Sequence, residues 1–168
     1  MAALRHEPAV LILSRQALPT LDRSTFAPAS GVAMGGYVLA EAYSGEPEVI
    51  LLATGSEVHL ALAARQELQA AGIGARVLSM TCTELFDRQP QQYRDAVLPP
   101  SVKARVAVEE ASTLGWDRYV GDGGVVVGMR TFGASAPLKQ LLTKFGFTPD
   151  RVAELARDRI AAARARHG

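Results

Sequence analysis

Hydrophobic residues fall into short runs that alternate with longer segments of mixed polarity. Short apolar runs bounded by polar or turn-forming residues are typical of buried strands. They cover residues 36–43, 49–53, 75–80, 104–110 and 125–129. Because helical segments separate several of these strands, the pattern predicts an α/β fold, in which a mainly parallel sheet is covered on both faces. The strand at 36–43 is expected to lie at an edge of that sheet.

A helix is predicted immediately after the second apolar run. Thr54 and Glu57 have the spacing of a capping box at its start, and Gly72 stands where a C-terminal cap belongs. Thr81 and Glu84 repeat the capping-box spacing before a shorter helix that ends near residue 88. The apolar face of the first helix would be formed by Leu60, Ala64 and Leu68.

Three later segments are also predicted to be helical. Residues 90–97 form a short helix that Pro99 and Pro100 stop, and residues 136–146 form another. The last helix begins at Thr148 and runs to about residue 164. Trp116 and Tyr119 are expected to pack a short helix after Gly115 rather than to stack on bases.

The start of the chain has a different pattern. Val10 to Leu13 are predicted to form a short buried strand, but Arg15 follows almost at once and Pro19 prevents a regular continuation. An arginine at a strand end can be a surface residue, an ion-pair partner or a planar fork that binds an anion. Residues 17–36 are rich in proline, glycine, serine and threonine, a composition typical of a linker.

Charge and composition exclude several classes of protein. The 168 residues include 18 basic and 17 acidic side chains, for a net charge of +1, so nucleic acid and anionic membrane surfaces are disfavoured as partners. No apolar run approaches the ~20 residues that cross a bilayer. The single cysteine, Cys82, cannot form an internal disulfide, so a cytoplasmic location is expected. Three histidines (His6, His59 and His167) and Cys82 share no metal-ligand spacing.

Candidate chemistry is expected at the carboxyl ends of the strands, where α/β sheets bind ligands. The turn from Thr54 to Glu57 could present backbone N–H groups to a small anion, although it lacks the glycines and lysine of nucleotide-binding loops. A well-capped helix is the simpler interpretation. The functional alternative is a self-sufficient α/β module that binds a small anion or has a regulatory role.

Two motifs with acidic residues are not expected to be catalytic or to bind metal. Gly121 to Gly124 (GDGG) resembles the start of a metal–diphosphate motif, but the chain contains no asparagine and a strand follows, so a glycine-rich turn is predicted. Glu109 and Glu110 are adjacent, and neighbours on a strand point to opposite faces, so they are not expected to act on one bond. They are predicted to be a surface pair at a strand end, with Glu109 alone able to lie near a site.

The motifs in order resemble the C-terminal portion of transketolase over essentially the whole chain. They are LSRQALP, VILLATGSEVHLA, ARVLSM, ELFDRQ, YRDAVLPP, RVAVEEASTLGWDRYVG and RTFGASAP. Two departures are Ala17, where the family commonly has asparagine, and Glu110, where it commonly has alanine. The resemblance implies a three-layer α/β sandwich with one antiparallel edge strand. It also implies three parts: a tail of the preceding domain (1–22), a linker (23–35) and a complete C-terminal domain (36–168).

The resemblance also implies a function. Transketolases transfer a two-carbon glycolaldehyde unit between ketose and aldose phosphates in the pentose phosphate pathway. They are homodimers that use thiamine diphosphate and a divalent cation, Mg²⁺ or Ca²⁺, held by other domains. This chain is therefore expected to bind no cofactor or metal and to be inactive alone. Arg15 matches the family's arginine that reaches the phosphate of the sugar substrate, a task that suits a guanidinium fork.

Overall fold

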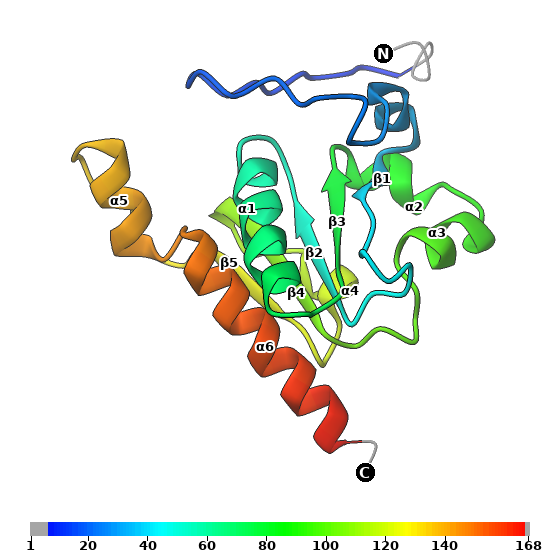
Figure 1. Cartoon of the computed structure of the whole chain (residues 1–168). Coiled ribbons are helices and arrows are strands. Elements are labelled where there is room, and N and C mark those ends of the chain that lie inside the picture. Colours follow the sequence, from blue (N-terminus) through cyan, green and yellow to red (C-terminus); the bar gives the residue numbers. More distant parts are fainter. Residues whose placement is uncertain (1–6, 167–168) are drawn as a thin grey trace.

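A computed structural model describes residues 7–166, which build a five-stranded sheet with helices on both faces (Figure 1). The elements follow the chain in the order η2 (Ala29–Met34, a 3-10 helix), β1 (Gly36–Ala40), β2 (Val49–Ala53), α1 (Glu57–Ala70), β3 (Ala75–Met80), α2 (Thr83–Asp87), α3 (Gln91–Val97), β4 (Arg105–Ser112), α4 (Asp117–Val120), β5 (Val125–Met129), α5 (Leu138–Phe145) and α6 (Pro149–Ala165). The predicted α/β class is confirmed.

The strand order is β1-β3-β2-β4-β5. Strands β3, β2, β4 and β5 are mutually parallel, and β1 pairs antiparallel with β3 at one edge. The expected antiparallel edge strand is thus confirmed. Glu109 and Ser112 flank a register irregularity between β4 and β5, where β4 continues beyond its last regular pair.

Alternation along the central strands divides the core into two clusters. On β2, Val49 and Leu51 face α1 and α6, whereas Ile50 and Leu52 face the side of α2, α3 and α4. Successive side chains on a strand point to opposite faces, and all four are fully buried. Burial on both faces is why β2 is an uninterrupted apolar run, as parallel central strands are. Trp116 and Tyr119 belong to the second cluster, as predicted.

Helix ends confirm the cap predicted at Gly72 and the helix start predicted at Thr148. Gly72 has a left-handed φ of 76°, and the N–H of Ile73 donates to the carbonyl of Leu68 at 2.9 Å, which closes a Schellman-type end of α1. Thr148 caps α6, because its hydroxyl accepts from the N–H of Arg151 at 3.4 Å.

The two predicted capping boxes are wrong. No side chain caps α1, whose N-cap residue is Ser56, or α2, whose N-cap residue is Cys82. The Thr54 hydroxyl donates instead to Glu109, and the Thr81 hydroxyl donates to the carbonyl of Gly35. In both cases the threonine hydroxyl donates to an acceptor that is distant in the sequence and does not cap the helix that follows.

The N-terminal segment, predicted to be an orphan strand from the tail of a preceding domain, does not join the sheet. Val10 to Leu13 form no strand, and their exposed fractions lie between 65% and 90%. A strand needs a neighbour for its backbone groups, and within residues 7–166 the segment has none. Further along, Phe26 packs against the core and the N–H of Ala27 donates to the carbonyl of Leu39 at 3.0 Å. Part of the predicted linker is therefore attached to the domain.

Helix α5 projects from the sheet in Figure 1. The connection before it, residues 130–137, is exposed throughout, and Phe132 is 99% exposed. Leu142 and Phe145 are the residues of α5 that pack against the main core. The predicted helix at 136–146 is confirmed with a later start, at Leu138.

Candidate functional site

The strand order creates a point where chain connections diverge. From β2 the chain leads through α1 to β3 on one side, and from β4 it leads through α4 to β5 on the other. In open α/β sheets, ligands bind in the crevice outside the carboxyl ends of two such strands. The strand ends here are marked by Thr54, which follows β2, and Glu109 on β4. The Thr54 hydroxyl donates to Glu109 Oε2 at 2.8 Å and so connects the ends of the two strands.

A second carboxylate lies beside this pair. Glu57, the first residue of α1, is only 5% exposed and accepts a hydrogen bond from the Ser56 hydroxyl. Burial raises the pKa of Glu57, and repulsion from Glu110 and Glu109 raises it further. Burial also raises the pKa of Glu110, with a smaller contribution from Glu109. The strand end therefore gathers negative charge, which opposes the small-anion site considered for the turn from Thr54 to Glu57.

The adjacent residues Glu109 and Glu110 lie in different surroundings. Both act on Glu57, although only Glu109 makes a hydrogen bond within the crevice, and Glu110 is exposed at the surface. The register irregularity that follows Glu109 ends the strict alternation of the strand there. The prediction that Glu109 could lie near a site agrees with its position at the switch point.

A cavity of about 700 Å³ opens above this edge of the sheet. Its walls combine the Thr54 and Glu109 pair with apolar side chains, including Met80, Trp116 and, from the N-terminal segment, Ile12. The Cys82 thiol, 3.5 Å from Glu84 Oε2, also lines it. Its polar groups are carboxylates, hydroxyls and the guanidinium of Arg118, which already pairs with Asp87. The cavity therefore offers mainly hydrogen-bond acceptors, with one charged donor at its wall.

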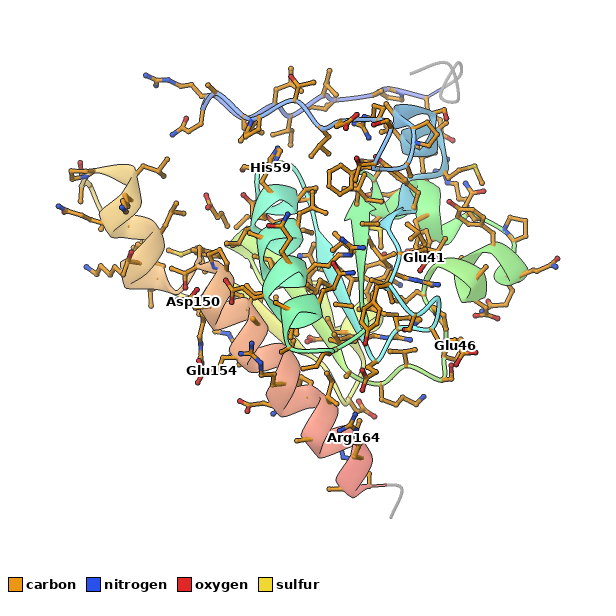
Figure 2. All side chains as sticks on the ribbon, in the orientation of Figure 1. Glu41, Glu46, His59, Asp150, Glu154 and Arg164 are labelled. Carbon is orange, nitrogen blue, oxygen red and sulfur yellow. The ribbon has the colours of Figure 1, made fainter. Side chains whose placement is uncertain are left out.

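Arg15, the predicted phosphate-binding residue, lies outside the domain core. It is exposed, and no hydrogen bond or ion pair joins it to any other residue in the range 7–166. Figure 1 shows its segment running across the end of the domain to which the parallel strands point. His59 lies near the end of α1 that is closest to this segment (Figure 2).

Potential metal ligands are dispersed over the described residues. Within residues 7–166, no three His, Cys, Asp or Glu side chains come together as cation ligands. Gly121 to Gly124 form the predicted turn, with the N–H of Gly124 donating to the carbonyl of Gly121 at 3.1 Å. No chemical step through a cofactor is therefore assigned to these residues. Over the same range, no helix has the length and apolar character needed to cross a bilayer.

Sequence reasoning missed the arginines that order the loops. Arg76, on β3, binds the Glu41 carboxylate and also donates to the carbonyls of Ala96 and Val97. Arg105, on β4, donates to three backbone carbonyls. A basic residue inside an apolar run, as in "ARVLSM" and "ARVAVEE", was the available signal.

Fold and strand-end crevice together define an α/β domain of the doubly wound type, with its cavity at the carboxyl edge of the sheet. The family described as "Transketolase-like TK C-terminal domain" matches residues 35–148. The chain therefore belongs to the transketolase C-terminal domain family, as the resemblance predicted.

Several transketolases are similar to this chain in sequence or in structure. Transketolase 1 of Escherichia coli (strain K12) is 50% identical over 151 residues, which cover 90% of this chain and 22% of that protein. A crystal structure of a transketolase H261F mutant from Pichia stipitis has a TM-score of 0.80 and 36% identity, covering 90% of this chain and 21% of its own. A more distant neighbour, described as split-gene transketolase, an inactive β4 tetramer, has a TM-score of 0.61 and 25% identity, covering 77% of this chain and 43% of its own. The chain spans about a fifth of the length of the full transketolases it matches.

Proposed function

We propose that this chain is the C-terminal segment of a transketolase that transfers a two-carbon glycolaldehyde unit between ketose and aldose phosphates. The observation that carries the proposal is the 50% identity with Transketolase 1 over nearly the whole chain. The complete enzyme would use thiamine diphosphate with Mg²⁺ or Ca²⁺, act as a homodimer and work in the cytoplasm. Its division into a tail (1–22), a linker (23–35) and a C-terminal domain (36–168) belongs to the same proposal.

Within that enzyme, Arg15 would bind the terminal phosphate of the sugar substrate. Its exposure and lack of a described partner leave all five guanidinium donors available. A guanidinium can donate two parallel, charge-assisted hydrogen bonds to phosphate oxygens, which fixes both the position and the orientation of the sugar. The short exposed segment that carries Arg15 would be held in place by the part of the enzyme that precedes it.

The chain by itself is proposed to be inactive. Diphosphate and metal binding need several oxygen ligands in fixed geometry, and the described residues show no such cluster. The split-gene neighbour is an inactive β4 tetramer, and this agrees with a chain that needs other parts of the enzyme for activity. What the segment contributes is then a folded domain and the phosphate-binding arginine.

A hybrid enzyme tests the proposal. The C-terminal fifth of Escherichia coli Transketolase 1 is replaced by residues 1–168, and glycolaldehyde transfer from xylulose 5-phosphate to ribose 5-phosphate is measured with thiamine diphosphate and Mg²⁺. We expect transfer by the hybrid and none by the isolated chain. A folded, dimeric hybrid without activity would contradict the proposal, and so would saturable thiamine diphosphate binding with turnover by the isolated chain.

A further inference from the structure

A second cavity lies on the opposite side of the sheet from α1 and α6. Its volume is about 450 Å³, and it is bounded by α2, α3, the loop that leads into β4, and α4. The charged side chains that line it are Asp87, Arg94, Asp95, Lys103, Arg105 and Arg118. Four of these are basic and two are acidic, which leaves a net charge of +2 on the walls.

Arg105 supplies positive charge that no carboxylate neutralises. Its guanidinium donates to the backbone carbonyls of Val102, Tyr119 and Pro99, at 2.9, 2.7 and 2.9 Å. These acceptors hold the side chain in place but carry no formal charge. Burial lowers the pKa of Arg105, and a nearby anion would favour its charged form.

Arg94 and Lys103 are in a similar position. The Arg94 guanidinium donates through Nη2 to the neutral amide oxygen of Gln91, and its buried Nε–H has no acceptor among the described residues. Lys103 is exposed at the rim and forms no ion pair within residues 7–166. A buried donor without an acceptor is destabilising, so Arg94 has hydrogen-bonding capacity to offer a ligand if its side chain adjusts.

The two carboxylates are already engaged. Asp87 pairs with Arg118 at 2.8 Å and accepts from the Tyr119 hydroxyl at 3.1 Å. Asp95 accepts from the Gln91 side chain at 2.7 Å. Because Gln91 is neutral, Asp95 keeps its charge, and the net charge of +2 is the excess of Arg94, Lys103 and Arg105 over this one carboxylate.

We propose that this cavity binds a phosphate dianion, either inorganic phosphate or the phosphate group of a small phosphomonoester. A phosphate group carries about −1.5 to −2 charges at neutral pH, which matches the net charge of the walls. Charge-assisted hydrogen bonds from a guanidinium and an ammonium group are the usual means of holding such a group. The site lies on a different part of the molecule from Arg15 and goes beyond the proposed function.

Calorimetric titration of the 168-residue chain in low salt tests the site, with inorganic phosphate, ribose 5-phosphate and ribose as ligands. We expect saturable binding of the first two and none of ribose. Equal affinity for both would assign recognition to the phosphate alone, and tighter binding of ribose 5-phosphate would add contacts to the sugar. Lys103→Ala should weaken binding roughly ten-fold, which corresponds to one charge-assisted contact.

Three comparisons make the result specific. Lys139→Ala removes the same charge from exposed α5 and should leave the affinity unchanged. Arg15→Ala should also leave it unchanged, and Arg94→Gln should weaken binding while the chain keeps its wild-type circular dichroism. The proposal is overturned if no phosphate compound binds, if Lys139→Ala weakens binding as much as Lys103→Ala, or if Arg15→Ala abolishes it. An inactive hybrid enzyme would leave these titrations unaffected, so the two proposals fail separately.

Discussion

Arg76 and Glu41 form an ion pair in which Arg76 is the least exposed of the charged partners found among residues 7–166. The Arg76 side chain is 9% exposed, and its Nε and Nη2 atoms donate to the two Glu41 oxygens at 2.9 and 3.0 Å. Glu41 directly follows β1 and is labelled in Figure 2. Because the remaining nitrogen of Arg76 binds the last carbonyls of α3, one side chain ties the edge strand to a helix end.

Arg76→Met is expected to lower the free energy of unfolding by about 2–4 kcal/mol, because it leaves buried α3 carbonyls without donors. Glu41→Gln should cost about 1 kcal/mol or less, since half of the Glu41 side chain is exposed and can be hydrated. Urea unfolding of both variants measures the difference. Equal losses would show that the ion pair itself, rather than the carbonyl contacts, stabilises this region.

Gly35 is expected to tolerate no side chain. Its φ is +82°, and an added Cβ would collide with backbone atoms of Cys82 and Phe86. Gly35→Ala should therefore cost more than about 3 kcal/mol of unfolding free energy. Gly72 has a φ of +76° but open space around it, so Gly72→Ala should cost only about 1–2 kcal/mol from backbone strain. Similar losses in thermal unfolding would mean that the chain relaxes around Gly35.

Glu57 is expected to make stability depend on pH. Its pKa is raised in the folded state above the ordinary value of 4.5, mainly by burial, so the folded chain holds this proton more tightly than the unfolded chain. The stabilisation from the protonated form is present below that value and is lost as the pH rises through the folded pKa. Glu57→Gln should therefore raise the unfolding free energy at pH 7, and its advantage should shrink toward zero near pH 4.

Urea unfolding of wild type and Glu57→Gln at both pH values measures this difference. Glu46→Gln removes an exposed carboxylate between β1 and β2 and serves as the control, with no comparable change in its effect. A Glu57→Gln advantage that grows toward acid pH would reverse the assigned sign.

Arg15→Ala in the active hybrid enzyme should raise the KM for phosphorylated sugars by roughly 10- to 150-fold, the equivalent of one charge-assisted contact of about 1.5–3 kcal/mol. Sugars without phosphate should be converted nearly as before. Arg23→Ala removes a guanidinium from the same segment, where it donates to the carbonyl of Ala27, and serves as the control. Equal losses for both kinds of sugar would indicate a role in folding or in the chemical step.

Val10 to Leu13 should exchange their amide hydrogens rapidly in the isolated chain, because these exposed residues make no strand pairs. The same amides should be protected in the hybrid enzyme, where the preceding domain could supply a neighbouring strand. Hydrogen exchange followed by mass spectrometry compares the two. Strong protection in a monomeric sample of the isolated chain would show that the segment has a partner within this domain.

Sequence by itself determined the elements whose cause is local. Val49 to Ala53 are predicted as a strand buried on both faces, because the run is apolar throughout, too short for a typical helix and bounded by polar residues. Thr148 before Pro149, and Gly72 after α1, mark helix ends through contacts only a few residues apart. The motifs along the whole chain, from LSRQALP to RTFGASAP, were likewise sufficient to indicate the family.

Tertiary structure decided what each polar side chain binds. A threonine hydroxyl beside a helix start can accept from a local N–H or donate to a distant acceptor. Thr54 donates to Glu109, 55 residues away, because the strand order brings β2 and β4 together. Val10 to Leu13 have the composition of a strand but no described neighbour, so hydrophobic pattern alone could not give them one. In the sequence, Arg76 and Arg105 cannot be distinguished from basic residues at the surface. The folded structure brings backbone carbonyls from separate segments within hydrogen-bond distance of their guanidinium groups.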